Sequence, residues 1–292
     1  MQSLRKSLSH DLKFNNGGPR WNSQDVQTFI LATILLVIFH YYGKASFLKS
    51  DRLETLSEFM PISPEAPYLE ILRYAYWAIM AVILRMLVPC LFIWFILKDS
   101  IRDYGFRVRG KPGYCRLYWL LFCIIIPILY LVSLTEGFQQ KYPLYPMAIN
   151  GWDHFFAWQL CYRTQFFALE AFFRGFLLFA LFKRFGYYSI LIMVMPYCMI
   201  HFGKPILETL GAIVAGSVLG YLALKSKTWL HGALLHFAVG FLMDLFAIFQ
   251  RGGFRDRSMD LENDYLTGCL WILVPENLSL KNSQDKPCHE ST

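Results

Sequence analysis

The amino-acid sequence predicts an all-α fold: a polytopic transmembrane bundle of about seven to eight helices. Two features of the composition predict it, because 55% of the 292 residues are hydrophobic and only 17% are charged. Soluble domains carry about 25% charged residues. The third observation is that the apolar residues, among them 26 Phe and 17 Tyr, are collected in long runs. The low charge excludes an ordinary cytosolic enzyme and a disordered chain.

Each expected span is a largely apolar run whose length is close to the roughly 20 residues that a membrane helix needs. Seven runs fit, in the order 27–42, 76–97, 117–134, 154–182, 187–202, 206–224 and 229–249. The first and fifth are short, and the fourth is long and carries polar residues. The sequence therefore predicts a polar N-terminal tail at 1–26, a membrane domain at 27–249 and a polar C-terminal tail at 250–292.

The basic residues predict the orientation of this multi-pass protein. The connection at 98–116 holds six Lys or Arg residues, whereas that at 135–153 holds only Lys141. Cytoplasmic loops carry the excess of basic residues, so 98–116 and the N-terminus are expected in the cytoplasm. Arg251, Arg255 and Arg257 do not fit this pattern, because seven spans would place them on the side opposite the cytoplasm. Either the tail re-enters the membrane, or the number of spans differs by one.

The net charge of +7 does not indicate a nucleic-acid partner. The basic residues fall mainly between the apolar runs and form no single stripe, so the expected partners are membrane lipids.

Ionisable side chains at membrane depth are the candidate functional groups, because each is costly unless it is paired or faces a cavity. In the fourth run Glu170 and Arg174 are four residues apart and share a helix face. Arg163 lies seven residues before Glu170, on nearly the same face. A charge pair that only joins two helices is the simplest alternative for these residues.

The next three runs add further polar groups. His201 ends the fifth run, and Glu208 falls in the first turn of the sixth, where the helix dipole favours a carboxylate. His231 and His236 of the last run are about 140° apart around a helix, so they cannot both face one site. We expect His236 to point into the bundle, on the same face as Gly240.

Such a set of groups can activate water. A carboxylate beside a neutral His can take a proton from water, and a second His can stabilise a developing oxyanion. Arg174 would hold a carboxylate ionised. Zinc is the alternative, since two His and one carboxylate can bind it with an open position. No HExxH motif is present, and the groups fall on separate helices, so the sequence predicts no metal and no other cofactor.

The order of these motifs resembles the CAAX-prenyl-protease and bacteriocin-processing (CPBP, or Abi) family. The resemblance is carried by Glu170-Ala-Phe-Phe-Arg174-Gly175, then Tyr197-x-x-x-His201, then the His236 span, within a motif core at 154–249. The family has EExxxR, FxxxH and HxxxN on successive membrane helices. The resemblance implies an intramembrane protease in which Glu170, Arg174, His201 and His236 are site residues.

Two positions depart from the motifs. Leu169 stands where the family has the Glu to which the general-base role is assigned, and Gly240 stands where it has Asn. Glu170 or Glu208 would then serve as the base. The sequence thus predicts an intramembrane endopeptidase that activates water with a Glu/His pair against a peptide, which can be prenylated. The first alternative is a catalytically silent relative that acts as a membrane scaffold, immunity or partner-binding protein. The second is a transporter.

Overall fold

The computed structural model describes residues 22–48, 52 and 69–254, and in this part the chain is helical with no strand. Six of its helices are long and apolar enough to span a membrane. The prediction of an all-α polytopic bundle is confirmed, and the chain is a multi-pass membrane protein. Most of the two predicted polar tails, 1–21 and 255–292, lies outside the described residues, as do Arg255 and Arg257.

The first three spans are α2 (Ser23–Tyr42), a composite helix, and α6 (Tyr114–Ser133). The composite helix consists of α4 (Leu69–Ala81), the π-helical segment η2 (Val82–Leu87) and α5 (Val88–Phe95). A short 3₁₀ turn, η3 (Ile101–Tyr104), lies in the basic connection before α6. These helices correspond to the first three predicted runs, of which the second and third extend one or two residues past the helix ends.

A second composite helix runs through the centre of the molecule. It consists of α8 (Trp152–Glu170), the π-helical segment η5 (Ala171–Leu177) and α9 (Leu178–Phe185). In its most apolar stretch 89% of the residues are buried in protein, compared with 11% in α6. The central helix can therefore carry polar side chains that a lipid-facing helix could not.

The remaining α-helices of the described residues are α7 (Glu136–Lys141), α10 (Tyr188–Met199), α11 (Ile206–Ser226) and α12 (Leu230–Phe249). The fifth predicted span corresponds to α10, which has 12 residues. At about 1.5 Å per residue this helix reaches only some 18 Å, less than the roughly 30 Å hydrocarbon core. The expectation of a fifth span at 187–202 is therefore corrected to a short apolar helix.

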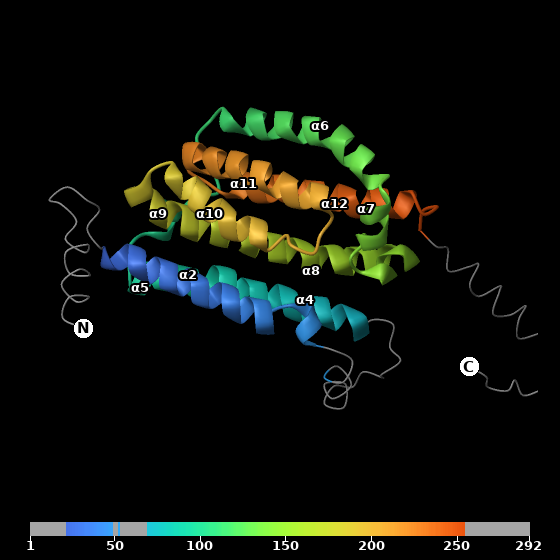
Figure 1. The fold of residues 1–292 in the computed structure, drawn as a ribbon, viewed down its shortest axis with the longest axis horizontal. Helices are drawn as coiled ribbons and strands as arrows, with labels where there is room; N and C mark the ends of the chain where they lie inside the picture. The colour runs from blue at the N-terminus through green and yellow to red at the C-terminus, as the bar shows by residue number, and fades with distance from the viewer. Residues whose placement is uncertain (1–21, 49–51, 53–68, 255–292) are drawn as a thin grey trace, which may run out of the picture.

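The helices are arranged in layers around the central one. In Figure 1, α2, α4 and α5 lie on one side, α8, α9 and α10 in the middle, and α6 on the far side beyond α11 and α12. α11 packs mainly on α10, and α6 packs mainly on α12. α11 therefore packs only loosely against both α6 and α12.

Glycines set how closely α10 and α11 approach. A Cβ on Gly216 would lie 3.0 Å from the Tyr197 ring and 3.1 Å from Val194. Small residues at such contacts let membrane helices pack through dispersion forces. Around Gly211, one and a half turns earlier, an added Cβ would meet nothing within 4 Å.

We predict that Gly216→Leu destabilises the bundle by about 1–3 kcal/mol, because the larger side chain overpacks the α10–α11 contact. Gly211→Leu is the matched control and should leave stability close to that of the wild type. Thermal unfolding in detergent, followed by tryptophan fluorescence, measures both. Equal stability of the two variants would contradict this packing account.

Candidate functional site

The central polar contact of the molecule joins the end of α8 to α12. Glu170 is fully buried, and its Oε1 accepts two hydrogen bonds. One comes from Nη1 of Arg174 at 2.8 Å, and the other comes from Nδ1 of His236 at 3.0 Å. The structure thus brings together three of the predicted site residues.

This contact fixes the hydrogen on the His236 ring. A carboxylate oxygen can only accept, so the hydrogen of the neutral imidazole is on Nδ1 and the lone pair is on Nε2. Phe166 stacks on the ring, with centroids 4.2 Å apart and planes inclined by 19°. The ring therefore has a defined tautomer and a defined plane.

His201 lies in the loop between α10 and α11. Its Nδ1 donates to the Tyr197 carbonyl at 2.8 Å, so the lone pair of the neutral ring is again on Nε2. Burial, with the nearby charge of Lys204 as the second cause, lowers the pKa of His201 to about 4. The ring is therefore neutral at pH 7.

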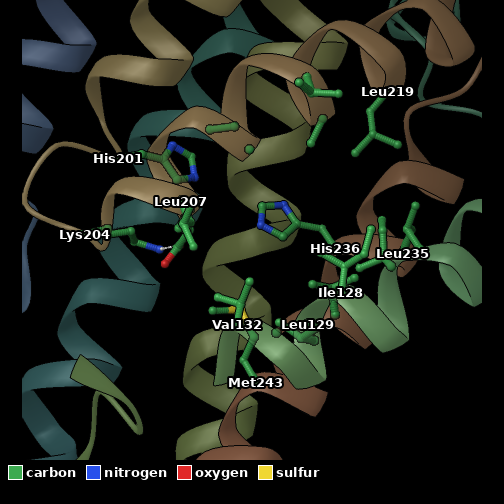
Figure 2. Close-up of a pocket in the computed structure, with 18 of the residues that line it drawn as sticks. Ile128, Leu129, Val132, His201, Lys204, Leu207, Leu219, Leu235, His236 and Met243 are labelled. Carbon is green, nitrogen blue, oxygen red and sulfur yellow. Dashed lines mark hydrogen bonds and ion pairs between the residues drawn. The ribbon is translucent and has the colours of Figure 1, made fainter. Parts of the chain in front are cut away.

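The two histidines face the same pocket from opposite sides, as Figure 2 shows. The pocket has a volume of about 460 Å³, and its wall includes His201, His236, Glu208 and Gly240. Glu170 and Arg174 are fully buried and are not part of that wall. Of the six predicted site residues, four line the pocket and two lie behind His236.

Glu208 is engaged in a contact of its own at the pocket wall. Its Oε1 accepts from Nζ of Lys204, and its Oε2 accepts from the Tyr142 hydroxyl at 2.6 Å. Burial alone would lower the pKa of Lys204, but Tyr162, Tyr142 and Glu208 together raise it well above its usual value. Both carboxylate oxygens of Glu208 are thus already used, one by Lys204 and one by Tyr142, and Glu208 makes no hydrogen bond with His201.

Sequence reasoning missed two members of this cluster. Lys204 stands in a Gly-Lys-Pro breaker, which has the pattern of an ordinary turn. Tyr142 is separated from Glu208 by 66 residues, so no local spacing connects them.

Gly240 faces a neighbouring side chain, not open space. A Cβ added there would collide with Nη1 of Arg163 and would lie 2.8 Å from the Phe166 ring. One turn further along α12, Asp244 pairs with Arg163 at 3.4 Å and accepts hydrogen bonds from Trp158 and Gln159. A second buried polar layer thus follows the Glu170 layer along the α8–α12 interface.

His231 lies away from the pocket, as the helical spacing predicts. Its Nε2 is 3.8 Å from Sγ of Cys115 at the start of α6. Among the described residues, no group of three or more His, Cys, Asp and Glu side chains is placed to hold a metal ion.

Comparison with protein families gives a match to the type II CAAX prenyl endopeptidase Rce1-like family over residues 152–242. These residues run from the start of α8 into α12 and contain the Glu170, His201 and His236 positions. The resemblance to the CAAX-protease family predicted from the motifs is confirmed over this region. Comparisons with curated proteins and with solved structures gave no match.

We predict that Arg174→Met destabilises the protein by about 3–5 kcal/mol, because it leaves the buried Glu170 charge without its cation. The double variant Glu170→Gln/Arg174→Met should recover much of that loss, since no net charge then stays buried. Denaturant unfolding in detergent measures the cycle. Strictly additive losses would contradict the coupling described here.

A second prediction concerns pH. The pKa of His201 is about 4 in the folded protein, below its value of about 6.5 in an unfolded chain. The unfolded state therefore binds the proton first, and stability falls as the pH drops from about 6.5 to 4. The loss is about 3 kcal/mol.

The measurement compares unfolding free energies of the wild type and His201→Gln across that pH range. The variant should lack this part of the acid sensitivity. Identical pH profiles for the two proteins would contradict a buried neutral His201.

Proposed function

We propose that this chain is an intramembrane endopeptidase that hydrolyses a peptide bond in a membrane-associated substrate. The observation that carries the proposal is the Glu170–His236 pair, whose imidazole opens into a pocket that His201 faces from the other side. The match of residues 152–242 to the type II CAAX prenyl endopeptidase Rce1-like family supports the same class of reaction.

In the proposed mechanism His236 is the general base. Its Nε2 lone pair takes a proton from water as the water oxygen attacks the scissile carbonyl carbon. Glu170 stabilises the resulting imidazolium through the Nδ1 hydrogen bond, as the carboxylate of a catalytic triad does. The imidazolium then returns the proton to the leaving amine nitrogen. Glu170 acts through His236, because it is buried behind that ring and does not reach the pocket.

Arg174 and His201 have supporting roles in this scheme. Arg174 holds Glu170 ionised and fixed in direction. His201 presents a second lone pair to the pocket and can accept a hydrogen bond from the attacking water. Burial and Lys204 disfavour its protonated form, so His201 is not assigned the role of base.

The shape and chemistry of the pocket support a lipidated peptide as the substrate. Away from the histidines and the Lys204–Glu208 pair, most of the wall is apolar, and much of it comes from α6 and α11, including Ile124, Ile128, Val214 and Val218. It lies along the loosely packed seam between α6 and α11. An apolar chain such as a prenyl group would bury itself there, gaining roughly 0.8 kcal/mol per CH₂ group.

The proposed reaction uses no metal. Each histidine already uses its Nδ1, and Glu208, the carboxylate in the pocket wall, is held by Lys204 and Tyr142. Zinc bound by His201 and His236 is the competing proposal, and chelator sensitivity separates the two.

We further propose that the N-terminus is cytoplasmic. Asp25 at the start of α2 pairs with Arg184 at the end of α9, and Asp99 pairs with Lys183. The basic connection at 98–116 therefore lies at the same end of the bundle as the start of α2, as Figure 1 shows.

A catalytically silent membrane protein is the second candidate. The observation in its favour is Leu169, which is 5% exposed and packs within the apolar core in place of the motif's first Glu.

We predict that His236→Ala lowers kcat about 10²–10⁴-fold, because a general base contributes on that order. Glu170→Gln should also lower kcat, since the neutral amide cannot stabilise the imidazolium. His231→Ala, on the same helix but outside the pocket, is the matched control and should cleave at the wild-type rate. A fluorogenic prenylated peptide, offered to purified protein in detergent, reports the cleavage.

Two results would count against this mechanism. Loss of wild-type activity on treatment with a strong chelator, restored by zinc, would favour the metal alternative. Absence of cleavage by the wild type, together with specific binding of the prenylated peptide, would favour the silent candidate.

A further inference from the structure

The proposed reaction still needs a hydrogen-bond donor for the oxyanion. When water adds to a carbonyl, the carbonyl oxygen becomes negative and is stabilised by preorganised donors. His201 and His236 both present acceptors to the pocket, because their Nδ1 hydrogens are already used elsewhere. Gly240, which is also in the wall, has no side chain that could donate. The donor must therefore come from another group that reaches the pocket.

Lys204 is a cation in the wall of this pocket. It is the only Lys or Arg among the described residues that line the pocket, and its side chain is 22% exposed. In Figure 2 it lies on the same side of the pocket as His201, and its side chain points inwards, with His236 on the opposite side. The ammonium group therefore reaches the space that the two imidazole rings face.

The turn between α10 and α11 places Lys204 next to His201. The backbone N–H of Lys204 donates to the His201 carbonyl at 3.1 Å. Gly203 between them has φ +86°, a conformation that glycine adopts without strain. The charge of Lys204 contributes to the lowered pKa of His201, which agrees with a short separation of the two side chains. One tight turn thus presents an acceptor and a donor to the same pocket.

Two neighbours hold the ammonium group in place and leave it one hydrogen. Nζ of Lys204 carries three hydrogens. One is donated to Oε1 of Glu208, and a second points toward the Tyr142 hydroxyl oxygen, 3.4 Å away. Among the described residues Nζ has no further hydrogen-bond partner, so its third hydrogen is available to a molecule in the pocket. Tyr142 also donates to Oε2 of Glu208, so the donor is held in position before a substrate binds.

We propose that Lys204 is a catalytic residue whose ammonium group donates a hydrogen bond to the oxyanion of the tetrahedral intermediate. This inference rests on the proposed peptidase function. The scissile carbonyl then lies between His236, which activates the water, and Lys204 on the opposite wall. Glu208 and Tyr142 are positioning residues, because they act through Lys204.

The electron movement is that of an ordinary acyl transfer. As the water oxygen bonds to the carbonyl carbon, the π electrons move to the carbonyl oxygen, and the Lys204 charge stabilises them there. When the C–N bond breaks, these electrons re-form the C=O double bond. The proton on Nζ stays on the nitrogen throughout, so Lys204 acts as a donor and not as an acid.

The test must separate this role from the ion pair with Glu208. Lys204→Gln alone leaves the Glu208 charge without its cation, which destabilises the fold. The double variant Lys204→Gln/Glu208→Gln removes both charges and is compared with Glu208→Gln, which keeps the Lys204 charge. Between the single and the double variant, kcat for the fluorogenic prenylated peptide should fall about 10²–10³-fold, with little change in KM. Thermal unfolding in detergent checks that both variants are folded.

Binding of two analogues gives a measurement that a purely structural role would not affect. A phosphinate analogue of the peptide carries an anionic tetrahedral centre, whereas an N-methylated peptide keeps a neutral planar carbonyl. The double variant should bind the phosphinate at least tenfold more weakly than Glu208→Gln does, and the two should bind the N-methylated peptide equally. Equal losses for both analogues would overturn the proposal. Lys225→Gln, at the other end of α11 and outside the pocket wall, is the control and should match the wild type.

A lysine in a pocket can also bind a carboxylate of the substrate, and the peptide terminus separates the two roles. Peptides with a free C-terminal carboxylate are compared with the same peptides as C-terminal amides. The loss of kcat in the double variant should be the same for both forms. A loss that appears as a higher KM, and only with the free carboxylate, would make Lys204 an anchor for the peptide terminus and would overturn the oxyanion role.

Failure of the function itself gives a different set of results. A wild type that does not cleave overturns both the function and this inference. Cleavage that is lost in His236→Ala, but has the same kcat in Glu208→Gln and the double variant, overturns only the role of Lys204. If Glu208→Gln itself does not cleave, the phosphinate affinities alone decide, and equal affinities of the single and double variants overturn the proposal.

Discussion

The buried carboxylate of Glu170 is the constraint on which the rest of the structure depends. Removing an ionised carboxylate from water costs several kcal/mol even in a relaxed protein interior. Here that cost is offset by Arg174 and His236, which both donate to the same oxygen. Because one partner is on the central helix and the other on α12, the charge can be buried only if these helices meet at this level. The same hydrogen bond that satisfies the charge also orients the His236 ring.

The surrounding layers follow from the need to keep this contact away from lipid. The central helix is almost enclosed, with α2, α4 and α5 covering one side and α10 to α12 the other. The outer helices contact the membrane lipid, and α6 is the least buried of them. Polar chemistry in a bilayer is thus possible here because the helix that carries it has protein neighbours in place of lipid neighbours.

Much of this could be predicted from the sequence, for specific reasons. The spans follow from length and hydropathy, and the Glu170–Arg174 contact follows from a spacing of four within one helix. The direction of His236 follows from its angular separation from His231. The contact between Glu170 and His236 could only be expected from the order of the family motifs, because no local spacing connects two residues 66 positions apart.

Other features depend on packing that no spacing encodes. Tyr142 reaches Glu208 only through the tertiary fold, because 66 residues separate them. Lys204 is four residues before Glu208, and that spacing could have indicated the ion pair that occupies this candidate base. The sequence marks Gly240 as a departure from a motif, but the side chain that fills its place comes from α8. The short α10 was expected as a full span, because an apolar run continues through its flanking turns.

The π-helical segment η5 has a consequence for how the chain tolerates change. It lies between Glu170 and the end of α9, where Lys183 and Arg184 pair with Asp99 and Asp25. A π-helical turn is wider than an α-helical turn, so it changes the direction in which every later side chain points from the helix axis. The buried Glu170 contacts and these terminal ion pairs can therefore both form on one continuous helix. Loss of a single residue within 171–177 would rotate one end against the other by about 100°. A one-residue change in the length of this stretch should therefore disturb both ends of the helix at once, whereas a substitution within it acts only on its own contacts.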